Sequence, residues 1–254
     1  MPISIFFIIY LGIWRYKRKK IIMSNNVIGL IVSYVYAFGL LGIIEFIGKK
    51  LGWPIWVTRK LTHIGAGLWV WGILYYFDDW EYGIIPFATF IVLNYIFYRF
   101  KIFKAMDEEE STPGTVYFAI SITLLFLLFW ETSGQPDYVF IAVASVMAMT
   151  WGDAMASLIG KSFGKKTYTV FGHTRTWEGS ITMFAFSYLA IGLTMQYLPG
   201  SELSPLSIVI TTYNIWFIAL PAALAATLAE AVAPAGTDNL TVPLFTAVVI
   251  WLFV

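Results

Sequence analysis

The 254-residue sequence contains no cysteine, and only 12% of its residues are charged. Without cysteine, the chain has neither disulfide bonds nor thiolate ligands for a metal. The scarcity of charge, the 59% of hydrophobic residues and a mean hydropathy of +0.76 exclude an ordinary soluble domain. Apolar and aromatic residues are abundant instead, so we expect one helical membrane domain without a separate soluble module.

Eight apolar runs are long enough, or nearly so, to cross a membrane as helices. They predict an all-α polytopic membrane protein with about eight transmembrane helices in one bundle. Several runs lie near or below the usual minimum of about 17 residues, which tilted packing or polar functional ends would explain. The predicted spans are Val27–Ile47, Leu61–Phe77, Tyr82–Tyr98, Gly114–Trp130, Tyr138–Ile159, Ser180–Leu198, Leu206–Leu228 and Leu240–Val254.

The connections between these runs alternate in charge. Most Lys and Arg residues follow the first, third and fifth runs, within 49–60, 99–104 and 161–175, whereas the opposite connections carry acids only. Because cytoplasmic loops of membrane proteins are enriched in Lys and Arg, the basic loops are predicted to face the cytoplasm.

The N-terminal residues contradict this scheme. A basic cluster precedes the first span and would lie on the wrong side of the membrane: Arg15, Lys17, Arg18, Lys19 and Lys20. The short apolar stretch Ile3–Trp14 is readable as a signal peptide, an extra span or sequence upstream of the real start. We expect initiation at Met23, which makes 1–22 an extension and 23–254 the membrane domain.

The segment Met149–Ser180 combines an acid within an apolar run with a basic, glycine-containing stretch and a second acid. Asp153 interrupts a predicted span, where an ionisable group costs about 2.5–3.5 kcal/mol and usually marks a functional site. Four cations separated by glycines follow, and then Glu178. Small residues also let membrane helices pack closely, and a basic loop also binds anionic headgroups. The order of acid, basic loop and acid favours a metal and a polyphosphate: Asp153, Lys161, Lys165, Lys166, Arg175, Glu178.

Two further polar clusters fall on the same predicted side. RKLTH, with Arg59, Lys60 and His63, opens the second span, and a basic membrane anchor with a capping histidine is the simpler interpretation. Glu230, Asp238 and Asn239 lie in a segment rich in Pro and Gly, which predicts a loop whose acids commonly serve solvation or capping. The convergence of the clusters on one membrane face favours a common site.

These segments resemble a known family. The run GDAMASLIGKSFGKK followed by TRTWEGS is similar to the signature of the CTP-dependent polyprenol kinases, including dolichol kinase and phytol kinase. RKLTH and AEAVAPAGTDNLTVP match two further blocks in the same order, and the resemblance covers roughly residues 25–254. Chain length and TPGTVYFAISIT are most like the phytol kinases of oxygenic phototrophs, which implies a plasma or thylakoid membrane.

The resemblance implies phosphorylation of a long-chain isoprenoid alcohol, such as phytol or geranylgeraniol, by CTP with Mg²⁺ at the cytoplasmic face. Asp153 is the first choice of metal ligand, with Glu178 and Asp238 as second choices. The general base stays open among His63, Asp153 and Glu230. The residues expected to bind the nucleotide are Arg59, Lys60, Gly160, Lys161, Gly164, Lys165, Lys166, Arg175, Thr176, Gly179 and Asn239.

Two other functions compete with this interpretation. A cytidylyltransferase similar to CDP-diacylglycerol synthase shares the acid, the glycines and a related KTxEG-like element, but its long C-terminal signature is missing here. A transporter would use Asp153 to bind a cation or proton, but it predicts charged groups on both sides of a pathway. We expect membrane lipid, the alcohol and the nucleotide as partners and no nucleic acid; the oligomeric state is left open.

Overall fold

The computed structural model describes residues 22–102, 112–130, 136–234 and 236–254. Nearly all of the regular structure in this part of the chain is helical, as predicted. The helices are α2 (Ile22–Leu51), α3 (Ile55–Tyr76), α4 (Trp80–Phe100), α5 (Gly114–Phe129), α6 (Val139–Met147), the π-helical turn η2 (Ala148–Asp153), α7 (Ala154–Phe163), α8 (Trp177–Tyr197), α9 (Thr212–Val232) and α10 (Asp238–Phe253).

Elements α6, η2 and α7 form one continuous helical segment. With this segment counted once, the described residues contain eight long helices, as the sequence predicts. Four of them are long and apolar enough to cross a membrane: Asn25–Leu51, Trp80–Phe100, Val139–Phe163 and Asn214–Val232. Helices α5 and α10 are apolar but shorter. The predicted extension, 1–22, lies almost entirely outside the described residues.

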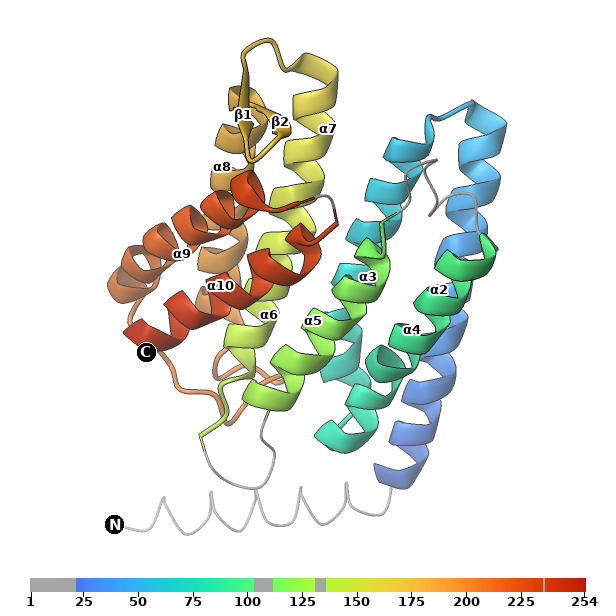
Figure 1. The fold of residues 1–254 in the computed structure, drawn as a ribbon. Coiled ribbons are helices and arrows are strands. Elements are labelled where there is room, and N and C mark those ends of the chain that lie inside the picture. Colours follow the sequence, from blue (N-terminus) through green and yellow to red (C-terminus); the bar gives the residue numbers. More distant parts are fainter. Residues whose placement is uncertain (1–21, 103–111, 131–135, 235) are drawn as a thin grey trace, which may run out of the picture.

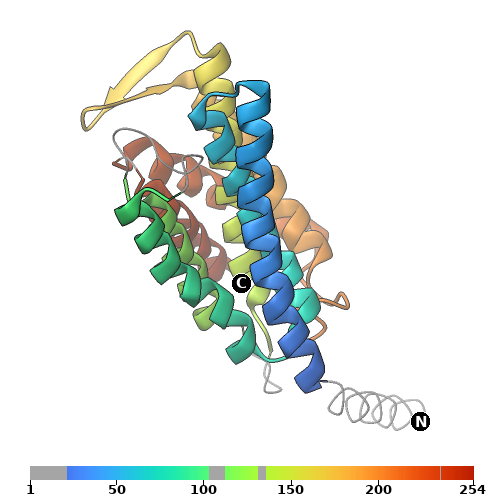
Figure 2. The same ribbon diagram turned by 90° about the vertical axis from the view of Figure 1, so that its right-hand side faces the viewer.

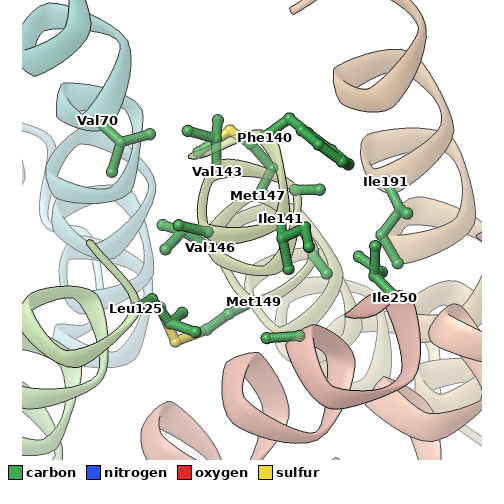
Figure 3. Close-up of a cluster of buried hydrophobic side chains, with 14 of the residues drawn as sticks. Val70, Leu125, Phe140, Ile141, Val143, Val146, Met147, Met149, Ile191 and Ile250 are labelled. Carbon is green, nitrogen blue, oxygen red and sulfur yellow. The ribbon is translucent and has the colours of Figure 1, made fainter. Parts of the chain in front are cut away.

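The segment α6–η2–α7 is the centre of the fold. All nine residues of α6 are buried, and the helix packs against α3, α5, α8 and α10. Figure 3 shows side chains of α6, among them Phe140 and Val143, between Val70 on one side and Ile191 and Ile250 on the other. A helix that is apolar on every side is stable only when enclosed or in lipid. The central position of this segment holds Asp153 among the other helices.

Two predictions about irregular segments are wrong. The predicted span Leu206–Leu228 began too early, because its helix, α9, begins at Thr212. The residues before it form an extended connection, in which Asp137 pairs with Ser207 and donates its N–H to the Leu206 carbonyl over 3.1 Å. The predicted loop holding Glu230, Asp238 and Asn239 is mostly helical. Glu230 lies in the last turn of α9, and Asp238 and Asn239 open α10.

The basic stretch between α7 and α8 forms a β-hairpin instead of an open loop. Strands β1 (Thr167–Val170) and β2 (His173–Thr176) pair antiparallel, and both turn residues, Phe171 and Gly172, have positive φ. Positive φ at both central positions matches the right-handed twist of a two-residue hairpin. The hairpin extends past the helices at the end of the bundle where α2 meets α3 (Figures 1 and 2). The fold is therefore nearly all-α. This hairpin holds His173 and Arg175, both in β2.

Candidate active site

The buried acid and the first basic cluster form one ion-paired group. Lys60 Nζ lies 2.7 Å from Asp153 Oδ2, and both side chains are almost fully buried. His63 Nε2 lies 3.8 Å from the same oxygen and 3.3 Å from the Met149 carbonyl oxygen. The π-helical turn supplies both Asp153 and Met149, and such turns are frequent at functional sites. The predicted meeting of RKLTH with Asp153 is therefore present in the structure.

The C-terminal cluster reaches the same region from the other side. Helix α10, which begins at Asp238, packs against η2, which ends at Asp153. Asn239 is part-buried, and its Oδ1 has no hydrogen-bond partner among the described residues. A buried acceptor without a partner is costly, so it is suited to receive a donor from a ligand.

Arg175 connects the hairpin to the C-terminal cluster. Its Nε lies 2.8 Å from Glu230 Oε1, and its Nη2 donates to the Ala233 carbonyl oxygen over 3.2 Å. The guanidinium thus ties β2 to the end of α9. Glu230 is therefore paired with Arg175, as His63 and Lys60 are paired with Asp153.

The other predicted phosphate-binding cations lie toward the hairpin. Lys161 is in the last turn of α7, with its Nζ 5.4 Å from the centre of the Trp56 ring. Lys165 and Lys166 are exposed between α7 and β1. Asp153 and Lys161 are eight residues apart on one helix, hence about 12 Å along its axis. The site is therefore an elongated strip from buried acid to exposed lysines.

Three of the predicted nucleotide-binding residues also have clear structural roles. A Cβ added at Gly160 or Gly179 would come within 2.8 Å of Thr176 Oγ1, so these glycines permit the close packing of α7 on α8. The Thr176 side chain caps α8 by accepting the Gly179 N–H over 3.1 Å.

Glu178 lies apart from the buried acids. Its carboxylate accepts the Lys166 N–H over 3.3 Å. Hydrogen bonds from the backbone N–H groups of Glu178 itself, Lys165 and Lys166 lower the pKa of Glu178 below its ordinary value. This arrangement fixes the start of the hairpin.

Mg²⁺ that binds together with a nucleotide needs few ligands from the protein itself. Among the described residues, no group of three or more His, Cys, Asp or Glu side chains has the geometry of a metal site. Mg²⁺ typically uses one or two carboxylates, phosphate oxygens and water. If Mg²⁺ is bound, Asp153 and Asp238, which lie on the packed elements η2 and α10, would be its carboxylate ligands, whereas Glu178 would need to leave its backbone partners.

A mostly apolar pocket adjoins the ion pair, and it was not predicted from the sequence. It lies between α2, α3, α4 and α5, has a cavity volume of about 130 Å³, and is polar at one end, where Arg59, Lys60, His63 and Asn239 line it. Its walls are mostly apolar, with Leu41, Phe87 and Phe118 among them. Pockets that bind apolar ligands commonly combine such walls with a few polar groups.

The comparisons with known proteins agree with this geometry. The chain is 32% identical to a phytol kinase of Synechocystis sp., over 88% of this chain and 90% of that protein. The chain belongs to the phytol kinase family. A farnesol kinase of Arabidopsis thaliana is 28% identical, over 65% of this chain and 56% of its own length. A probable phytol kinase 2 of Glycine max is 28% identical, over 77% and 65%.

No protein-family model and no solved structure matches the chain. Membership of the phytol kinase family indicates a prenol kinase, a phosphotransferase with an alcohol acceptor, and it favours that activity over the cytidylyltransferase and transporter alternatives. A polar strip beside an apolar pocket is what a phosphotransferase with an apolar alcohol acceptor needs.

Proposed function

We propose that the protein transfers the γ-phosphoryl group of CTP to a long-chain isoprenoid alcohol bound in the pocket between α2, α3, α4 and α5. The observation that supports this most is the position of the Lys60–Asp153 pair at the polar end of that pocket. Phytol and geranylgeraniol are the expected acceptors, and CTP, or UTP, is the expected donor over ATP. The donor preference rests on family resemblance alone.

The roles follow from charge and position. Phosphoryl transfer depends mainly on orientation and on neutralising charge, so a strip of cations beside carboxylates suits it. Asp153 and Asp238 would hold Mg²⁺, which neutralises phosphate charge when bound, and Glu178 remains a second-choice ligand. Lys60 would hold Asp153 in place through their ion pair, while His63 and Asn239, which line the polar end of the pocket, would contact the acceptor hydroxyl. Lys161, Lys165 and Lys166 would bind the rest of the triphosphate.

Assays in detergent with each alcohol and each donor test this function. We expect phosphorylated phytol and geranylgeraniol with CTP, and little product with diacylglycerol, whose hydroxyl is surrounded differently from that of an allylic alcohol. Strong ATP-driven phosphorylation of diacylglycerol would refute both the donor and the acceptor assignment.

We also propose that the helices form a multi-pass membrane bundle with the active site at the cytoplasmic face. Outward-facing side chains on the long helices are apolar, such as Val35 and Phe46 on α2, which are 66% and 67% exposed. Exposed apolar surface of this kind is stable in lipid and unfavourable in water. The charged connections would then lie at the membrane surfaces.

Single cysteines test the topology directly, because the native chain has none. A probe at Ser162, at the end of α7, should react with a thiol reagent from the cytoplasm. A probe at Ser201, after α8, should react only from the opposite side. Ser111 lies outside the described residues and should react like Ser162. Reaction of Ser162 and Ser201 from the same side would overturn the membrane scheme.

Replacing Lys165 and Lys166 together by Ala should raise the Michaelis constant for CTP about tenfold, with a smaller change in turnover, because these exposed lysines would contact phosphates that bind alike in ground and transition states. The matched control replaces Lys49 and Lys50, which lie at the end of α2, and should leave that constant unchanged. An effect confined to the alcohol's Michaelis constant would contradict the assignment.

A further inference from the structure

The turn of the β1–β2 hairpin carries an apolar side chain in an unfavourable position. Phe171 is 82% exposed, and among the described residues no large apolar side chain is more exposed. Its φ is 48°, in the left-handed region that Gly and Asn favour and that bulky side chains rarely adopt. Exposure and backbone conformation both disfavour phenylalanine at this position, which points to a partner for the ring outside the described part of the chain.

The two faces of the hairpin differ in polarity. One face is directed toward the bundle, because Arg175 on it donates to the Ala233 carbonyl oxygen at the end of α9 over 3.2 Å. The opposite, more exposed face carries only threonines, at Thr167, Thr169, Thr174 and Thr176. A threonine face is suited to water, so the exposed apolar surface of the hairpin is confined to its turn.

The hairpin runs sideways across the end of the helix bundle. In Figure 2 it leaves the end of α7, and its turn lies at the outer edge of the molecule. Four paired residues in each strand, at about 3.3 Å each, give a reach of about 13 Å, which exceeds the width of one helix, about 10–12 Å. If the long helices cross the membrane, a hairpin that leaves them sideways follows the membrane surface.

The side chains at the base of the hairpin are suited to the same surface. Trp177 is 56% exposed, and its ring lies against Tyr168 with the centroids 5.1 Å apart. Lys165 and Lys166 are exposed between α7 and β1. Aromatic side chains gather at membrane interfaces, and lysines near the surface are attracted to anionic headgroups. Both the base and the turn of the hairpin therefore fit a lipid surface.

We propose that the hairpin lies on the cytoplasmic surface of the membrane and that Phe171 anchors its turn among the lipid headgroups. This inference rests on the proposed membrane bundle, because it takes the ends of the helices as the level of the headgroups. The ring then lies about 5–10 Å below the membrane surface, as apolar side chains of interfacial segments do. Together with the Arg175–Glu230 pair near its base, this contact fixes the hairpin at both ends.

Spin labels on single cysteines test the anchor, because the native chain has no cysteine. The protein is placed in nanodiscs of phosphatidylcholine and phosphatidylglycerol, and collisions with oxygen and with a water-soluble nickel chelate give the depth of each label. The label at Phe171→Cys should lie about 5–10 Å below the phosphates. A label at Thr174→Cys, on the exposed face, should lie in water. Val35→Cys, 66% exposed on α2, is the lipid reference.

These labels separate the anchor from the membrane bundle on which it rests. If the label at Val35→Cys lies in water, the proposed bundle is wrong. If that label lies in lipid, but the label at Phe171→Cys is as accessible to the chelate as the one at Thr174→Cys, the anchor is wrong. Few collisions of the Phe171→Cys label with either reagent would mean that a protein surface covers the turn, which also overturns the proposal.

A second set of variants tests the phenylalanine ring itself. Phe171→Asn introduces a residue that this type of turn favours, so the hairpin should remain folded. A label at Thr169→Cys should become more mobile in the Phe171→Asn background, because the turn loses its contact with lipid. Its mobility should stay at the wild-type level in Phe171→Leu, which keeps an apolar side chain. Equal mobility in all three backgrounds would overturn the anchoring role of Phe171.

Discussion

Asp153→Asn should reduce the rate of prenol phosphorylation at least about 100-fold, the scale expected when a group that stabilises transition-state charge is lost. Asp153 is the acid deepest in the central helix, and it contacts both Lys60 and His63. The amide keeps the size of the side chain but loses the charge that would bind a cation. Initial rates with saturating CTP and alcohol measure the effect.

The control for this variant is Asp137→Asn. Asp137 is equally buried, but it lies before α6 at the opposite end of the central segment, where its Oδ1 accepts the Val139 N–H over 2.6 Å. Its replacement should affect stability more than turnover. Near wild-type turnover in folded Asp153→Asn would exclude the metal-ligand role, and equal losses in the two variants would indicate a general effect of buried acids.

Lys60→Met should lower both activity and stability. It leaves the buried Asp153 carboxylate without its closest cation, and breaking a buried pair by removing one partner typically costs 3–5 kcal/mol. We expect an activity loss of about 100-fold or more, because the displaced carboxylate no longer has the required position. Thermal unfolding in detergent and initial rates measure the two effects separately.

A double variant separates structure from chemistry at this pair. Lys60→Met combined with Asp153→Asn removes both charges, so it should recover much of the stability lost in Lys60→Met. It should recover none of the activity. Lys50→Met, at an exposed site at the end of α2, serves as the control and should change turnover by no more than about twofold. Recovery of activity in the double variant would mean that the pair has only a structural role.

The sequence was sufficient to predict the helices but not their irregular ends. Apolar runs and charged connections located all eight long helices. The start of α9 was wrong because an apolar run can also serve as an extended connection, here fixed by the backbone pairing of Asp137 with Ser207. The helical position of Glu230 was missed because Pro234 and Gly236 suggested a loop, whereas the alanine-rich segment before them continues α9 to Val232.

Residues of the candidate site with distinctive chemistry could be predicted from the sequence. Their contacts, the hairpin and the pocket could not. Asp153 stands out as an acid in an apolar run, but its partner Lys60 lies 93 residues away, and no spacing rule predicts that contact. The hairpin was missed because its four-residue strands are too short for a periodic pattern. The pocket was missed because residues such as Trp69 and Phe118 cannot be distinguished in sequence from core or lipid-facing residues.

The most direct test of the central claim determines which phosphate of CTP is transferred to the lipid. The protein is incubated with phytol or geranylgeraniol, or with a phosphorylated lipid, and with CTP labelled at either the α- or the γ-phosphate. A prenol kinase transfers the γ label to the lipid. With α-labelled CTP the label stays in CDP, and the lipid product is unlabelled. Appearance of the α label in the lipid, with release of pyrophosphate, would contradict the account and indicate a cytidylyltransferase.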